Sequence, residues 1–131
     1  MTPYNLLRLR CGLSQPEAAR LHNVRLDTVK SWCAGRNRPP PAVLAELRAL
    51  HARIERAAAE ALAAIAAAPG ADEIELGYAA DDHEAEGLGW PCVGAQAAML
   101  GLVLARLDRP VHLVPRGSTL ATAAAAAASE P

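Results

Sequence analysis

The chain has 131 residues and a formal net charge of −1, a length that suits one domain with a modest core or two small ones. Residues 1–56 carry ten Lys or Arg against four Asp or Glu, whereas residues 57–131 carry three against ten, giving net charges of +6 and −7. This asymmetry favours a protein that binds a polyanion through its first half only. Three widely spaced cysteines without a C-x-x-C pair argue against a disulfide framework and predict a reduced, cytoplasmic protein.

An N-terminal helix is predicted over residues 3–11, and Gly12 ends it. Three leucines of this helix are expected to face partly inward: Leu6, Leu7 and Leu9. Arg8 and Arg10 interrupt the apolar character of the same stretch, so the start of the chain does not have the pattern of a signal peptide.

A second and a third short helix are predicted to follow as a packed pair. Residues 14–17, Ser-Gln-Pro-Glu, have the pattern of a capping box, in which the Ser hydroxyl and the Glu carboxylate each accept an amide of the other residue. Asn23 lies at the corner, where a positive φ is usually needed and Asn tolerates it better than most residues. The third helix is predicted over residues 26–33, with Val29 and Trp32 on its apolar side.

This stretch resembles the Cro/repressor-type (XRE-like) family of helix-turn-helix transcriptional regulators. In that family Leu-Ser-Gln opens the second helix, as residues 13–15 do here, and a small residue follows at the position of Ala19. A Gly with basic and Pro residues closes the third helix, as residues 35–39 do. The chain departs from the pattern with Asn23 for Gly and Arg25 for Ser, and the second departure removes the expected helix cap. The resemblance implies a lambda-repressor-like DNA-binding fold, a scaffold that also occurs in antitoxins.

The third helix is expected to enter the major groove of DNA with its N-terminal end toward the bases. Side chains opposite its apolar side are the candidates for base contacts, since Arg, Lys, Asp, Thr and Ser can all bond to base edges. They are Arg25, Asp27, Thr28, Lys30 and Ser31. The candidates for phosphate contacts are Arg36, Asn37, Arg38 and, as the resemblance also implies, Gln15. Three further arginines are expected to be solvated surface charges: Arg48, Arg53 and Arg56.

A long helix is predicted from Pro41 to about residue 68, after the break that the three prolines at 39–41 make. Its apolar residues recur in steps of three and four and form an amphipathic stripe. The stripe consists of Leu47, Leu50, Ile54, Ala57, Ala61 and Ala64. Its N-terminal part is expected to pack on the first three helices, and its alanine-rich end on a partner helix or on the second half of the chain.

The second half has the pattern of a β-α-β unit. Alternating residues predict a strand over 73–78, the Gly-Trp-Pro sequence at 89–91 opens a helix that runs to about residue 107, and a second strand follows over 111–114. The acidic residues 81–89 are predicted to form a loop. A unit of this size is too small to stand well alone, so we expect the long helix and a second copy of the chain to complete it.

This order of elements resembles the anti-CRISPR-associated autoregulators and the related small YdiL-like proteins. Gly89, Trp90, the apolar helix after them and residues 111–114 carry the resemblance. It implies that a C-terminal dimerisation domain follows the helix-turn-helix. The expected contacts of the dimer are Trp90, Val93, Ala97, Leu100 and Leu104.

The sequence predicts no catalytic site, metal site or cofactor. The four histidines are dispersed, and the acidic run over 81–86 lacks the Asp-x-Asp-x-Asp-Gly order of a calcium loop. No Gly-rich phosphate loop, nucleophile elbow or paired catalytic carboxylate is evident, so we do not expect an enzyme. The apolar stretch over 93–107 is too short and too rich in Gly and Ala to predict a membrane span.

These patterns together predict a mainly α protein with a small β-α-β part. We expect a helix-turn-helix domain over residues 1–40, a long helix over 41–68 that completes it, a dimerisation domain over 69–117 and a disordered, Ala-rich tail over 118–131. The expected function is that of a homodimeric repressor of transcription, which binds an inverted repeat in double-stranded DNA, its own promoter being one candidate.

Two alternatives stay open at this point. In the first, the chain is an antitoxin-like module whose acidic second half binds a basic partner protein. In the second, the same basic face binds RNA. The chain has no Phe, two Trp and two Tyr, and this poverty of aromatic residues argues against general binding of single strands.

Overall fold

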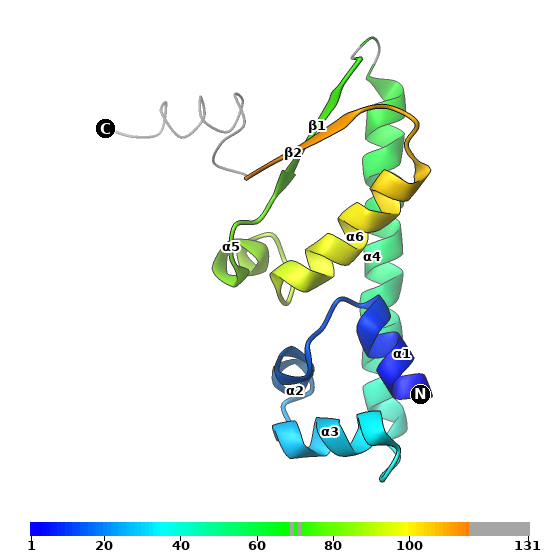
Figure 1. The fold of residues 1–131 in the computed structure, drawn as a ribbon, viewed down its shortest axis with the longest axis vertical. Coiled ribbons are helices and arrows are strands. Elements are labelled where there is room, and N and C mark those ends of the chain that lie inside the picture. Colours follow the sequence, from blue (N-terminus) through cyan, green and yellow to red (C-terminus); the bar gives the residue numbers. More distant parts are fainter. Residues whose placement is uncertain (69, 71, 116–131) are drawn as a thin grey trace, which may run out of the picture.

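The computed structural model describes residues 1–68, 70 and 72–115. This part of the chain is mainly helical with a small parallel sheet, as the sequence predicts. Its elements are α1 (Pro3–Arg10), α2 (Gln15–His22), α3 (Leu26–Ala34), α4 (Pro41–Ala67), β1 (Ile74–Tyr78), α5 (Asp82–Gly87), α6 (Val93–Arg106) and β2 (Val111–Pro115). The first three helices lie toward one end of α4, and α6 and the strands lie toward its other end (Figure 1). The predicted tail over residues 118–131 lies outside the described residues.

The side of α1 that faces the core is not the one predicted from the positions of its leucines. Tyr4 and Arg8 are buried, whereas Leu6 and Leu9 are 49% and 52% exposed, so the expectation that these two leucines face inward is wrong. Arg8 tolerates burial because its guanidinium donates two hydrogen bonds, each 2.7 Å long. One goes to the Leu13 carbonyl and the other to the side-chain carbonyl of Asn5, one turn earlier in α1. These bonds fix the loop that leads from α1 into α2.

Helices α2 and α3 begin and end where the local chemistry predicts. Ser14 and Glu17 form both hydrogen bonds of the capping box: the Ser14 amide donates to the Glu17 carboxylate (2.8 Å), and the Glu17 amide donates to the Ser14 hydroxyl (3.2 Å). Asn23 ends α2 in the left-handed conformation, with φ 56° and ψ 49°. Arg25 precedes α3 without a side-chain cap, and Gly35 ends α3 at φ 79°. The two helices pack on each other across the three-residue turn over 23–25.

Helix α4 supplies the buried stripe on which both halves of the chain pack. The stripe consists of Leu47, Leu50, Ile54 and Ala58. It differs from the prediction at its C-terminal end, where Ala57 and Ala61 are half-buried and Ala64 is exposed. At about 100° per residue, Ala57 and Ala64 both lie roughly 60–80° to one side of Ile54, whereas Ala58 remains within the stripe. Among the described helices, α4 included, none combines the length and the apolar character needed to cross a membrane.

The second half has the strands and the helix of the predicted β-α-β unit, with the short helix α5 in addition between β1 and α6. β1 and β2 pair in parallel, with Ile74 opposite Val111, and α6 connects them and packs on α4. The end of β1 is fixed to α6 because the buried Gln96 side chain accepts the Ala79 amide over 2.8 Å. Helix α6 begins at Val93 rather than at the predicted residues 89–91, since the chain is still extended at residue 92.

Residues 82–87 form a short helix, and the prediction of a loop there is wrong. Asp81 caps this helix by accepting the Glu84 amide over 2.8 Å, and Ala85 is fully buried. Asp81, Asp82 and Glu84 therefore lie at the helix N-terminus, where negative charge is favourable. Asp82 also accepts the Val93 amide over 2.9 Å and so connects α5 with the start of α6.

The two halves of the chain meet where two glycine backbones touch. A Cβ atom added at Gly94 would lie 1.9 Å from the Gly12 carbonyl oxygen, and one added at Gly12 would lie 2.0 Å from the Gly94 carbonyl oxygen. Cys11 and Cys92, beside this contact, are fully buried. Only glycine at both positions allows the loop after α1 to approach α6 so closely.

We predict that Gly94→Ala lowers the free energy of unfolding by about 1–3 kcal/mol or more, because the added methyl group overlaps the Gly12 backbone. Chemical denaturation monitored by circular dichroism measures the change. Gly87→Ala is the matched control, since its Cβ would meet nothing within 4 Å; we expect an effect of at most about 1 kcal/mol. Equal stabilities of the two variants would contradict the close contact.

Candidate nucleic-acid interface

Helix α3 presents a charged outer face and an apolar inner face. Val29 and Trp32 are buried on the inner face, in the core shared with α1 and α4. Three of the predicted base-contacting residues, Arg25, Asp27 and Lys30, are exposed, whereas Thr28 is half-buried. The exposed charges lie at the N-terminal end and middle of α3.

Ser31 does not lie on this outer face. It is 8% exposed, and its hydroxyl accepts a hydrogen bond of 2.6 Å from the Asn37 side-chain amide. The expectation that Ser31 faces outward is therefore wrong, and the Asn37 amide, predicted to contact phosphate, binds the protein itself. This bond connects α3 to the segment that follows it, which carries Arg36 and Arg38.

The residues predicted to contact phosphates differ in their solvent exposure. Arg36 and Arg38 are exposed just after α3, and Gln15 is half-buried at the first position of α2. The N-terminus of α2 is a weaker anion site than predicted, because the Glu17 carboxylate already accepts the Ser14 amide and Pro16 has no N–H. The arginines after α3 are thus the more available anion-binding groups.

A partly buried polar network, which was not predicted from the sequence, holds α3 in place. The His22 side chain has no exposed surface; its Nδ1 bonds to the Glu46 carboxylate over 2.5 Å and its Nε2 to the Tyr4 hydroxyl over 3.0 Å. The His22 ring also lies 6.0 Å from Trp32 of α3, and the Tyr4 ring 5.4 Å from Trp32, edge to face. Thr2 donates to the Trp32 carbonyl over 3.3 Å.

This network joins four helices at one point. Tyr4 comes from α1, His22 from α2, Trp32 from α3 and Glu46 from α4, so a shift of one helix disturbs the partners of the others. Neither Tyr4 nor His22 belongs to an apolar pattern, and their partners are 18 and 24 residues apart along the chain. The sequence offers no local signal for this hydrogen-bond network beyond the presence of a histidine at the end of the second predicted helix.

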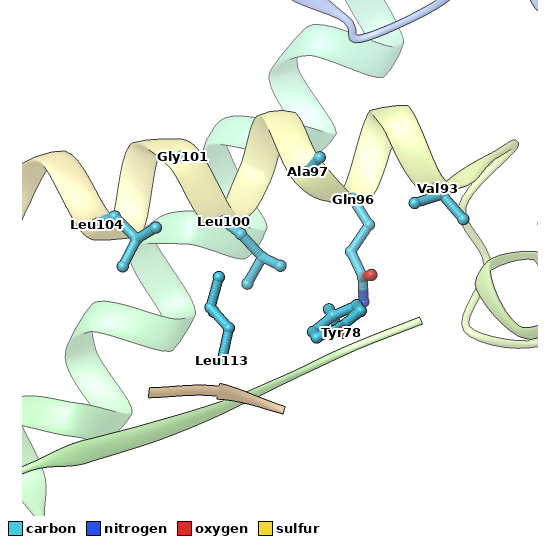
Figure 2. A pocket seen from close by; sticks show the side chains of 8 residues that line it. All are labelled: Tyr78, Val93, Gln96, Ala97, Leu100, Gly101, Leu104 and Leu113. Carbon is cyan, nitrogen blue, oxygen red and sulfur yellow. The ribbon is translucent and has the colours of Figure 1, made fainter. Parts of the chain in front are cut away.

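A second surface lies between α6 and the strands, and we call it the α6–β groove. Its volume is about 280 Å³, and the side chains that line it are almost all apolar: Tyr78, Val93, Gln96, Ala97, Leu100, Gly101, Leu104 and Leu113. Leu100 of α6 and Leu113 of β2 point toward one another across it (Figure 2). Leu104 and Leu113 are 38% and 41% exposed, and both belong to this one apolar surface.

Four of the five predicted dimer contacts line the α6–β groove, namely Val93, Ala97, Leu100 and Leu104. Trp90 does not line it. Its ring is 7% exposed and lies under the Arg53 guanidinium, 4.5 Å from the ring centroid, on the α4 side of the segment before α6. Trp90 therefore belongs to the core of one chain.

No protein-family model matches the chain, and a comparison with curated proteins finds no match either. The two surfaces described above, the outer face of α3 and the α6–β groove, are therefore the basis for assigning a function. Among the described residues, no group of three or more His, Cys, Asp or Glu is arranged to hold a metal ion.

We predict that stability falls at alkaline pH and that Tyr4 contributes to the fall. Burial raises the pKa of Tyr4 from 10.0 to about 12 and that of Cys11 from 9.0 to about 11. Above pH 9 to 10 the unfolded chain loses these protons while the folded chain keeps them, so the free energy of unfolding decreases as the pH rises toward 12.

Denaturation curves at pH 8 to 11.5 measure this dependence, and Tyr4→Phe isolates one group. The variant should lose about 1–3 kcal/mol at neutral pH, because His22 loses a buried partner. Between pH 10 and 11.5 its stability should fall less steeply than that of the wild type. Parallel slopes in that interval would show that Tyr4 is not buried as described.

Proposed function

We propose that this protein is a repressor of transcription that binds double-stranded DNA through a helix-turn-helix formed by α2 and α3. The observation that carries the proposal is the outer face of α3. It exposes Arg25, Asp27 and Lys30, while the opposite face is buried and held by the network around His22. A rigid helix with charged side chains on its outer face can read base edges in the major groove.

The charges around α3 support the same function. Arg36 and Arg38 are exposed immediately after α3, and Arg20 is exposed on α2. The first 56 residues carry a net charge of +6 and the remainder −7, so the α3 end of the molecule attracts the phosphate backbone and the other end repels it. Such a distribution orients the protein on DNA.

The α6–β groove supports action as a homodimer. Its lining contains no charged side chain. Such a surface is suited to pack against the same apolar groove of a second copy of the chain, rather than against a strongly basic partner such as a toxin. Each strand of the two-stranded sheet has only one neighbour in the described chain, and so small a sheet gains stability from further packing. A twofold dimer would present two α3 helices to half-sites about 34 Å apart, on an inverted repeat.

Selection of random-sequence duplex DNA on the purified full chain, at about 150 mM salt, tests this function. We expect enrichment of an inverted repeat with half-sites about one turn apart. Weak, salt-sensitive binding without enrichment would contradict it. In that case competition by RNA hairpins, or co-purification of a small basic protein, would favour one of the two alternatives.

We predict that Lys30→Ala weakens binding to the selected site by about 1–3 kcal/mol and relaxes the preference at one base pair. Arg36→Ala should weaken binding to all sequences alike and reduce the salt dependence by about one unit of slope. Fluorescence anisotropy at several salt concentrations measures both effects. Arg106→Ala, at an exposed arginine at the end of α6, is the control and should bind like the wild type.

We predict that Leu104→Asp converts the dimer into folded monomers, because it places a charge in the α6–β groove at a side chain that is already 38% exposed. Analytical ultracentrifugation measures the mass, and circular dichroism shows whether the fold is intact. Ala105→Asp is the matched control: residue 105 is exposed on the same helix but outside the groove. A Leu104→Asp variant that stays fully dimeric would refute this interface.

A further inference from the structure

A second hollow lies at the junction of the two halves, on the side of α4 that carries Arg53. It is an open surface depression with a volume of about 580 Å³. Its floor is apolar, formed by Leu21 of α2, Leu50 of α4 and Trp90 of the segment before α6. Arg53, Arg56 and Glu86 supply the charges around this floor. We call it the junction cavity.

Arg53 is held in a defined position in this cavity. Its guanidinium stacks on the Trp90 ring, 4.5 Å from the centroid. The position that a Cβ atom would take at Gly89 is 2.8 Å from the Arg53 Nη2 atom, so the guanidinium occupies space that a side chain at residue 89 would fill. Gly89 also has φ 88°, which disfavours any other residue there. Arg53, expected to be a solvated surface charge, is half-buried, and one face of its guanidinium is covered by Trp90.

Stacking leaves the hydrogen-bonding edges of the Arg53 guanidinium unused. Among the described residues, neither Arg53 nor Arg56 has a carboxylate within 4.0 Å, and neither donates a hydrogen bond to the protein. Glu86 borders the cavity without pairing with either arginine. Two arginines without acceptors border the apolar floor of one open depression, which also has Glu86 at its edge. A planar guanidinium is suited to bind a carboxylate or phosphate through two parallel bonds.

We propose that the junction cavity binds a small organic anion, a carboxylate joined to a planar apolar group. Arg53 binds the carboxylate, Arg56 adds positive charge, and the apolar floor covers the body of the ligand. This site goes beyond the proposed function and does not depend on it. If that function holds, a ligand here touches α2 as well as the segment before α6, and so a difference in its affinity for free and DNA-bound protein would regulate binding.

Benzoate is the probe for this proposal, and the isosteric neutral molecule benzamide is its matched ligand control. The full chain is titrated without nucleic acid while the indole N–H signal of Trp90 is followed by nuclear magnetic resonance. We expect benzoate to shift this signal saturably, with a Kd of roughly 1–10 mM, and benzamide to leave it almost unchanged. Failure of DNA binding would not affect this measurement.

Arg53→Met tests the assigned residue, because methionine retains an apolar stem over Trp90 and removes the charge. It should weaken benzoate binding about tenfold or more. Arg48→Met, at an exposed arginine of α4 outside the cavity, should bind like the wild type. Arg53→Lys provides a second variant that keeps the charge; it should also bind more weakly, because lysine lacks the planar fork.

Three results would overturn the proposal. The first is the absence of a saturable shift of the Trp90 signal with benzoate. The second is equal affinity of the wild type and a folded Arg53 variant, with folding checked by thermal melting. Equal shifts with benzamide would likewise show that the cavity selects the ring and not the charge.

Discussion

The packing of α1 and α6 on the buried stripe of α4 is the interaction on which the rest of the structure depends. Leu47, Leu50 and Ile54 of this stripe belong to one core that contains Tyr4 and Trp32 from the first half and Trp90 from the second. A two-stranded parallel sheet with one helix buries too little apolar surface to be stable alone. Helix α4 supplies the missing surface, and the touching backbones of Gly12 and Gly94 let both halves reach it at once.

The position of α3 depends on polar as well as apolar contacts. Apolar packing alone tolerates small shifts, because many arrangements of leucine and valine have similar free energies. The hydrogen bonds of His22 to Glu46 and Tyr4 are less tolerant, since breaking either leaves a polar group buried without a partner. The network therefore restricts the orientation of the helix that carries Arg25 and Lys30.

Local signals in the sequence predicted the elements that depend on local chemistry. The capping box at residues 14–17, the corner at Asn23 and the period of α4 are set by neighbours within one turn, and the structure has all three. Predictions failed where a contact with a residue outside the local pattern determines burial or secondary structure. Arg8 and Ser31 are buried where they bond to Leu13 and Asn37, although the Arg8 Nε atom has no hydrogen-bond partner among the described residues. Residues 82–87 form a helix because a capping aspartate and the burial of Ala85 outweigh an acidic composition typical of loops.

The same distinction applies to the candidate sites. Charge and helical period located three exposed residues at α3 and four of the residues of the α6–β groove. Ser31 is buried instead, and Trp90 lies under Arg53 rather than in the groove. In the proposed dimer the α3 helix and the groove lie toward different ends of α4, a helix about 40 Å long. The spacing of two α3 helices on DNA would then be set through α4 and the contact between Gly12 and Gly94. If the protein binds DNA as proposed, a displacement at that contact would change the spacing of the two α3 helices, and the close fit of Gly12 and Gly94 would limit it.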